Sequence, residues 1–189
     1  YAELTYCGEH VSIASLPGMK ERTVLINGFS KAYAMTGWRV GYCAANKTLA
    51  KIMSNFLSHS TGAPSTISQW ASVEALTGPQ EGIEAMRLAF LERRDYIVKR
   101  INSIPGVSCI VPNGAFYVMM NIEQLIGKTL GGKLIENDDD FAVALLEKAL
   151  VAVVPCSGFG MKNFVRWSYA ASMENIEKGL DRLEKFVTE

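Results

Sequence analysis

The longest periodic segment of the sequence runs from Gln80 to about Asn102, and it limits the folds open to this chain. Apolar side chains recur in it at helical spacing, while arginine and lysine occupy the other faces; the apolar stripe consists of Ile83, Met86, Phe90, Ile97 and Ile101. At 1.5 Å per residue such a helix is ~35 Å long, which is enough to join two lobes. Pro105 and Gly106 follow the segment and end it.

The pattern differs on the two sides of this helix. Residues 1–90 contain two short β-branched and apolar runs, 23–27 and 39–44, which predict buried strands. The segment between them is too short for a helical crossover, so it predicts an antiparallel pair or a tight functional loop. Helix-start residues and later breakers predict two helices after these strands, over 46–56 and 64–76.

Residues 104–189 carry shorter and mixed elements, which predict a small α+β domain, with the helix over 80–103 as the bridge to it. Strands are expected over 107–111, 115–121, 151–154 and 164–168, a loop around 127–132, and helices over 141–150 and after Ser172. The buried stripe of the last helix is expected to be Ile176, Leu180, Leu183 and Val187. We interpret the acids Asp138 to Asp140 as solvated helix-start charges rather than a metal cluster.

Composition excludes several classes of protein. The 189 residues are 49% apolar, with 19 basic and 19 acidic side chains, so we expect a soluble globular chain with no field that attracts nucleic acid. No apolar stretch approaches the ~20 residues of a membrane span. The four cysteines and two histidines lie far apart, which predicts no metal site and a reduced, cytoplasmic compartment. Because the chain opens on Tyr1 without an initiator methionine, we expect a piece of a longer protein.

One segment, Gly28 to Gly41, is poorly explained by packing. Lys31 directly follows the first predicted strand, among small residues, and Arg39 lies at the start of the second. Lysine forms imines with carbonyl compounds when desolvation or a neighbouring cation lowers its pKa. Arg39 would supply that cation and bind a phosphate or carboxylate. Residue types alone also fit an ordinary solvated loop.

The same segment resembles the pyridoxal-phosphate attachment region of class I and II aminotransferases. In that family a small residue precedes Ser-Lys, and Gly-x-Arg-x-Gly follows after a five-residue spacer; the matching positions here are Ser30, Lys31, Gly37, Arg39 and Gly41. The resemblance covers nearly the whole chain. It implies a fold-type I architecture of class α/β: part of a large domain, with a mixed sheet and helices, plus a small carboxyl-terminal α+β domain.

The resemblance implies a role for four residues of the first region. Lys31 would bind the aldehyde of pyridoxal 5'-phosphate as an imine and then act as general base and acid on the substrate's α-proton. Ser30 and Arg39 would bind the cofactor's phosphate. Tyr1 matches a tyrosine that donates to the phenolic oxygen of the cofactor ring.

Two residues of the second region also match the family. The segment 164–170 resembles the one whose arginine binds the substrate α-carboxylate, and Arg166 is the match. Asn113 opens a segment, 113–117, that resembles the small-domain hairpin and is expected to contact substrate. The loop 155–160 departs from the family pattern, which usually carries glycine where Cys156 stands.

The activity implied is transamination between an L-amino acid and a 2-oxo acid, since residues 33–39 resemble the aspartate and aromatic aminotransferase subgroup. The resemblance also implies a homodimer, and it matches this chain to the carboxyl-terminal half of such an enzyme, so we expect the chain alone to be inactive. Three alternatives remain open: a pyridoxal-phosphate-dependent carbon–sulfur lyase of the same fold, the cofactor-sensing domain of a transcription regulator, and a degenerate fragment that serves as a binding surface.

Overall fold

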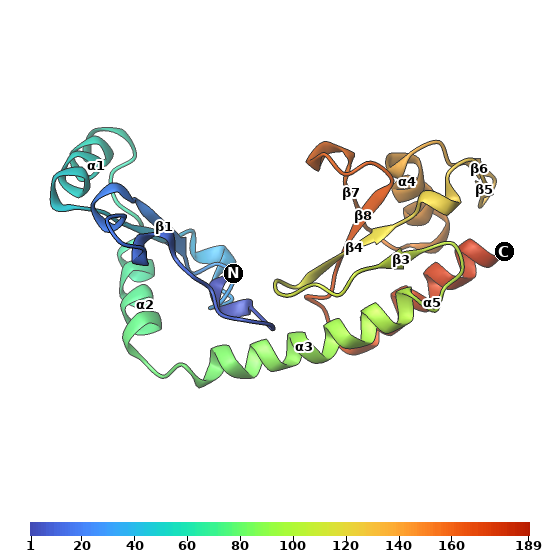
Figure 1. Cartoon of the computed structure of the whole chain (residues 1–189), viewed down its shortest axis with the longest axis horizontal. Coiled ribbons are helices and arrows are strands. Elements are labelled where there is room, and N and C mark those ends of the chain that lie inside the picture. Colours follow the sequence, from blue (N-terminus) through green and yellow to red (C-terminus); the bar gives the residue numbers. More distant parts are fainter. The chain divides into compact units, whose positions relative to one another are not determined.

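Helix α3, green in Figure 1, spans Glu81–Ile101, and the boundary between the two compact units of the chain falls within it. The computed structural model describes all of residues 1–189, divided into a first unit, Tyr1–Arg87, and a second unit, Leu88–Glu189. Acidic side chains occupy the first turn of α3 and basic ones its last turn, which suits the helix dipole. The helix expected over residues 80–102 is therefore confirmed to within one residue at each end.

The first unit is built around an antiparallel pair of strands. Strand β1 (Leu25–Gly28) pairs with β2 (Gly41–Ala44), so the antiparallel reading of the short connection is confirmed. The strands were expected to be buried, and this is wrong: all of β2 is exposed, and Ile26 of β1 is 81% exposed. The physical reason is that β1 and β2 pair only with each other, so their ladder satisfies the backbone without a second layer over the side chains.

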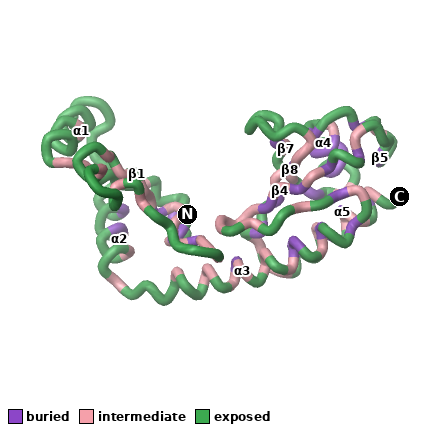
Figure 2. The backbone as a smooth tube through the Cα atoms, viewed as in Figure 1, coloured by how far each residue is buried: buried purple, intermediate pink, exposed green.

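Two helices follow the strands in the first unit. Helix α1 (Lys47–Ser60) begins where expected, because the side chain of Asn46 accepts a hydrogen bond from the Leu49 amide at 3.0 Å. It has no buried residue, and Figure 2 shows it almost wholly exposed. Helix α2 (Thr66–Thr77) follows Pro64 as predicted. Short 3-10 turns complete the unit at Ala2–Leu4, Ile13–Ser15, Lys20–Arg22 and Thr36–Trp38.

The second unit contains a four-stranded antiparallel sheet with two further helices. Its strand order is β3 (Ser108–Cys109), β4 (Tyr117–Asn121), β8 (Phe164–Ser168) and β7 (Val154–Pro155). Helices α4 (Asp138–Ala149) and α5 (Met173–Thr188) contribute further core side chains, and so does α3. Alternate residues of β4 and β8 are buried, as the period of two requires. Together with residues of α4 and α5 they form a large part of the core: Val118, Met120, Val165, Trp167, Phe141, Leu145, Ile176, Leu180 and Leu183.

Five expectations for the second unit need correction. The strand expected over 107–111 shortens to β3, and the strand expected over 151–154 is replaced by β7, which shares only Val154 with it. The loop around 127–132 is a small hairpin, β5 (Thr129–Leu130) and β6 (Lys133–Leu134), because the two glycines between them take the positive φ angles of a tight turn. In α5 the fourth buried residue is Phe186 rather than Val187. Asp138 is buried rather than solvated, since a loop from β7 covers it.

No helix of the chain combines the length and the apolar character that crossing a membrane requires. No three histidine, cysteine, aspartate or glutamate side chains are grouped in a way that could hold a metal ion.

Candidate active site

The connection between β1 and β2 carries three of the predicted cofactor residues. Ser30 and Lys31 lie two and three residues after the end of β1, and Arg39 lies two residues before β2. The antiparallel ladder ends on the pair Gly28 and Gly41, so the chain that leaves β1 returns to the same end of the pair. The structure therefore brings these three side chains into one closed loop, residues 29–40.

Apolar side chains anchor this loop. Phe29, Ala32 and Met35 are all buried, with 1%, 2% and 8% of their surface exposed. The ring of Phe29 lies 5.5 Å from that of Tyr33 and 5.4 Å from that of Tyr42. The apolar side chains of the loop are the buried ones, so its polar side chains remain accessible to solvent. Lys31 and Arg39 are exposed, and Ser30 is half-buried.

Arg39 has an unusual backbone. Its φ of 51° and ψ of 48° lie in the left-handed region, which costs a non-glycine residue roughly 1–2 kcal/mol. Its Nη1 donates a hydrogen bond to the Thr36 carbonyl at 3.0 Å. Strain of this kind is concentrated at functional sites.

Arg39 also lines a cavity of about 590 Å³ together with Trp38, Ser65 and Ser68. The hydroxyl of Ser68 donates to the Trp38 carbonyl at 2.9 Å and so ties α2 to the loop. Lys31 is not among the residues that line this cavity. The two cations thus share a loop but not a cavity within the first unit.

Tyr1 lies beside β1 rather than in the loop. It is 47% exposed and lines a separate cavity of about 660 Å³ with residues of β1, among them Asn27. This cavity includes neither Lys31 nor Arg39. The structure thus places Tyr1 in the same unit as the other cofactor candidates, next to the strand that leads into Ser30.

Arg166 belongs to the second unit, in β8, where it lies opposite Met119 of β4 and Val154 of β7. Its guanidinium carbon lies 5.1 Å from the centroid of the Tyr117 ring and 5.4 Å from that of Phe159. A guanidinium that stacks on aromatic rings keeps its N–H donors in its own plane. A planar guanidinium can donate two parallel hydrogen bonds to a carboxylate.

Asn113 lies in the exposed turn that precedes β4, in the same unit as Arg166. Tyr169 fixes the residues that follow the turn, because its amide donates to the Phe116 carbonyl at 2.8 Å and its hydroxyl to the Ala115 carbonyl at 3.2 Å. The segment then enters β4 at Tyr117, the ring on which Arg166 stacks. Asn113 is thus connected to the Arg166 region through this short backbone segment.

Comparison with known proteins decides the family. A profile described as aminotransferase class I and II matches residues 1–183. The chain belongs to this family. Aspartate aminotransferase from Geobacillus stearothermophilus is 46% identical over 189 residues, which cover 99% of this chain and 47% of that enzyme. Aspartate aminotransferase from Rhizobium meliloti strain 1021 is 47% identical over 97% of this chain and 45% of its own length.

Solved aminotransferase structures agree with this assignment. The crystal structure of the aspartate aminotransferase from Rhizobium meliloti matches with a TM-score of 0.93 and 44% identity, covering all of this chain and 48% of that one. Aromatic aminotransferase from Pyrococcus horikoshii matches with a TM-score of 0.87 and 37% identity, covering all of this chain and 49% of that one. The α/β class with a partial aminotransferase fold is thus confirmed, and the chain spans about half the length of the relatives it matches.

Sequence reasoning missed three residues near Arg166. Tyr117 and Phe159 were seen only as parts of longer segments, and their contact with the guanidinium depends on strand register and loop folding. Asp138 was grouped with two neighbouring acids, although it alone of the three is buried. The one available signal was its place at the start of a helix, which does not distinguish it from Asp139.

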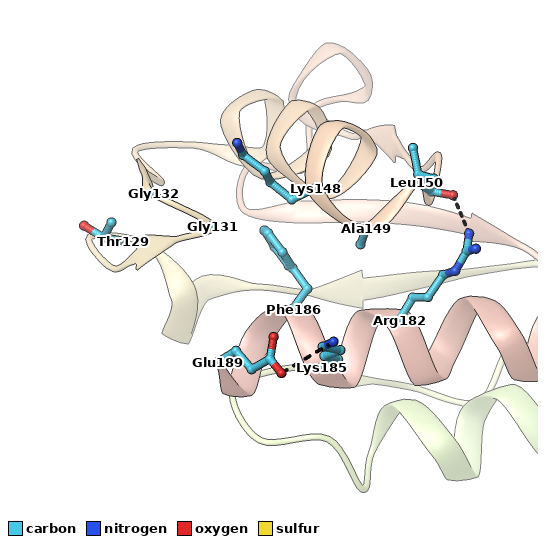
Figure 3. A pocket seen from close by; sticks show the side chains of 10 residues that line it. All are labelled: Thr129, Gly131, Gly132, Lys148, Ala149, Leu150, Arg182, Lys185, Phe186 and Glu189. Carbon is cyan, nitrogen blue, oxygen red and sulfur yellow. Dashed lines mark hydrogen bonds and ion pairs between the residues drawn. The ribbon is translucent and has the colours of Figure 1, made fainter.

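A third cavity, of about 600 Å³, lies in the second unit, and none of the predicted site residues lines it (Figure 3). Two of its basic side chains have partners: Arg182 donates to the Leu150 carbonyl at 3.3 Å, and the ammonium of Lys185 lies 3.7 Å from Glu189. Phe186 lies between the β5–β6 turn and α4 and supplies the apolar wall. We assign this cavity no role in the family's chemistry.

Proposed function

We propose that this chain is part of a pyridoxal-phosphate-dependent aminotransferase that exchanges the amino group of an L-amino acid with a 2-oxo acid, as its aspartate aminotransferase relatives are named to do. The family assignment supports this reaction class. The observation that carries the proposal is the loop of residues 29–40, which carries Ser30, Lys31 and Arg39 between two paired strands, with Lys31 and Arg39 exposed and Ser30 half-buried.

The donor set of this loop fits pyridoxal phosphate. An accessible primary amine suits an aldehyde, and a guanidinium and a hydroxyl suit a phosphate. When bound, the cofactor supplies an electron-accepting ring that makes the α-hydrogen of an amino acid acidic. The chain needs to supply only attachment, orientation and proton transfer.

Each residue of the first unit then has one task. Lys31 would hold the cofactor through its amine, and its Nζ would accept the α-proton of the substrate and return it. Arg39 holds the phosphate with a planar fork of donors, and the Ser30 hydroxyl adds a further hydrogen bond. The Tyr1 hydroxyl donates to the phenolic oxygen of the cofactor.

The second unit supplies recognition of the substrate. Arg166 binds the α-carboxylate with two parallel hydrogen bonds, and Asn113 adds a polar contact to the substrate. Because these bonds form with the bound amino acid before and during reaction, they govern orientation of the Cα–H bond as well as affinity. The side-chain preference of the enzyme is not assigned by these residues.

The activity belongs to the full-length protein, since the chain spans about half of its relatives. We propose that the full-length protein is a cytoplasmic homodimer. We predict that the 189-residue chain alone neither turns over amino acids nor forms a chromophore that borohydride fixes on Lys31.

The test is cofactor attachment in the full-length protein. Borohydride reduction followed by peptide mapping should place the cofactor on Lys31, Lys31→Ala should abolish both attachment and transamination, and Lys51→Ala, which removes an exposed lysine from α1, should change neither. Attachment elsewhere would overturn the proposal. Amino transfer from an amino acid to a 2-oxo acid supports the aminotransferase, whereas release of pyruvate from cystathionine without such transfer would make the protein a carbon–sulfur lyase.

A further inference from the structure

The carboxylate of Asp138 is buried, although the residue is the first of helix α4. Only 2% of its surface is exposed. Its Oδ2 accepts two hydrogen bonds, from the amides of Cys156 and Ser157, each at 2.7 Å. Asn137 already caps the helix, because its side chain accepts from the Asp140 amide at 2.9 Å. The Asp138 carboxylate therefore does not cap its own helix and instead binds the loop between β7 and β8.

That loop, residues 156–161, is tied together internally. The Cys156 carbonyl accepts hydrogen bonds from the amides of Phe159 at 2.9 Å and Met161 at 3.1 Å, and the Ser157 carbonyl accepts one from Gly160 at 2.9 Å. Gly160 takes a φ of 82°, which closes the turn at little steric cost. Because the loop is linked in this way, a change at its first two residues is transmitted to Phe159.

Phe159 connects this loop to Arg166. Its ring is 64% exposed and lies 5.4 Å from the Arg166 guanidinium. An exposed ring has few neighbours to hold it, so its place depends on the loop backbone. Tyr117, by contrast, is held within strand β4. Of the two rings on which Arg166 stacks, Phe159 is thus the one that depends on Asp138.

Electrostatics keep Asp138 in the form that this contact needs. Burial alone would raise the pKa of its carboxyl, but hydrogen bonds from the amides of Ser157, of Asp138 itself and of Cys156 outweigh burial, so the pKa is lowered. At neutral pH the group is an anion and accepts from both loop amides. Hydrogen bonds to a charged acceptor are stronger than neutral ones.

We propose that Asp138 is a positioning residue for substrate binding: by holding the amides of Cys156 and Ser157 it fixes the loop that places Phe159 against Arg166, and so sets the guanidinium for a substrate carboxylate. This inference rests on the proposed function, which gives Arg166 the carboxylate.

The test compares Asp138→Asn and Asp138→Ala with Asp139→Asn in the full-length protein. Asp139→Asn removes the same charge from the same helical turn at an exposed position. Asp138→Ala should raise KM for the amino acid roughly tenfold while kcat changes little, because carboxylate binding is made in both the ground state and the transition state. Asp138→Asn keeps one acceptor oxygen and should raise KM less. Asp139→Asn should leave both constants unchanged.

A double variant tests the route of the effect. If Asp138 acts through Phe159, Phe159→Leu combined with Asp138→Asn should raise KM no more than Phe159→Leu alone, because coupled residues are not additive. Amide exchange at Cys156 and Ser157 should become faster in Asp138→Asn and stay slow in Asp139→Asn. Additive effects of the two substitutions on KM, or unchanged amide exchange at Cys156 and Ser157, would overturn the proposal. If Asp138→Ala does not fold, Asp138→Asn still provides the test.

Binding of succinate, a carboxylate that cannot undergo amino transfer, separates this inference from the proposed function. Weaker succinate binding in Asp138→Asn, at a level between the wild type and Arg166→Lys, supports the positioning role even if the wild type fails to transaminate. If Asp138→Asn binds succinate as tightly as the wild type does, and the wild type transaminates, the positioning role is overturned and the proposed function stands.

Discussion

Gly28 and Gly41 face each other across the last rung of the β1–β2 ladder, directly below the loop that holds Lys31 and Arg39. A Cβ on Gly41 would lie 3.0 Å from the Asn27 carbonyl oxygen and 3.6 Å from the Cα of Gly28. Both neighbours are backbone atoms, which cannot move aside independently of the strand. The close approach therefore requires glycine at this position for packing rather than for backbone conformation.

Gly41→Ala should destabilise the chain by about 1–3 kcal/mol, because overpacking against backbone forces the strands apart. The control is Gly37→Ala, since a Cβ at Gly37 meets nothing within 4 Å. Urea unfolding measures both variants, and the control should stay within about 0.5 kcal/mol of the wild type. Equal stability of the two variants would show that the ladder tolerates the extra methyl group.

The left-handed backbone of Arg39 gives a second prediction. Both Arg39→Gly and Arg39→Ala remove the guanidinium, so both should weaken binding of pyridoxal phosphate by the full-length protein at least tenfold. Glycine adopts this conformation without strain, whereas alanine does not, so the Gly variant should be the more stable by roughly 0.5–1 kcal/mol. Cofactor titration and thermal unfolding measure the two effects separately. A Gly variant less stable than the Ala variant would contradict the role assigned to strain.

The sequence predicted those elements whose signals are local. Asn46 and Ser172 were expected at the starts of helices, and both side chains cap those helices by accepting amide hydrogen bonds, from Leu49 and Asn175. The buried stripe of α5 followed from spacing alone, apart from its last member. Signals of this kind depend on only a few neighbouring residues, so they can be recognised in the sequence without knowledge of the tertiary fold.

Burial and long-range contact could not be predicted in the same way. An apolar run such as 23–27 shows that a strand will form but not whether another layer covers it, and Ile26 remains exposed. Asp138 and Asp139 are equivalent in sequence, yet only Asp138 lies under the loop from β7. The motif around Lys31 located three candidate residues in one loop, whereas the contact of Phe159 with Arg166 needed the register of β8.

The four free cysteines should differ in reactivity toward iodoacetamide. Burial raises the pKa of Cys109 to about 11, despite a hydrogen bond from Asn102 that lowers it. Burial also raises the pKa of Cys156, and the neighbouring Asp138 charge raises it further. At pH 8 about one Cys109 thiol in a thousand is ionised, and the thiolate is the reactive form. Peptide mapping of the chain should show Cys7 and Cys43, both exposed, alkylated first. Alkylation of Cys109 at the rate of Cys7 would contradict its burial.

The lowered pKa of Asp138 predicts how the stability of the chain depends on pH. A carboxyl whose pKa is lower in the folded state than in the unfolded chain adds stability above its unfolded value, about 3.9, and loses it as pH falls through the folded value. At pH 7 Asp138→Asn should therefore cost about 2 kcal/mol, the worth of hydrogen bonds to a buried charge. Below about pH 4 the difference in unfolding free energy between this variant and the wild type should shrink, because the wild-type carboxyl becomes protonated.

Asp139→Asn should change the unfolding free energy by less than about 0.5 kcal/mol at pH 7, since its side chain is exposed. Urea unfolding of the three proteins between pH 7 and pH 3 measures these differences, and a constant cost of Asp138→Asn across that range would show that the loop amides do not stabilise the anion.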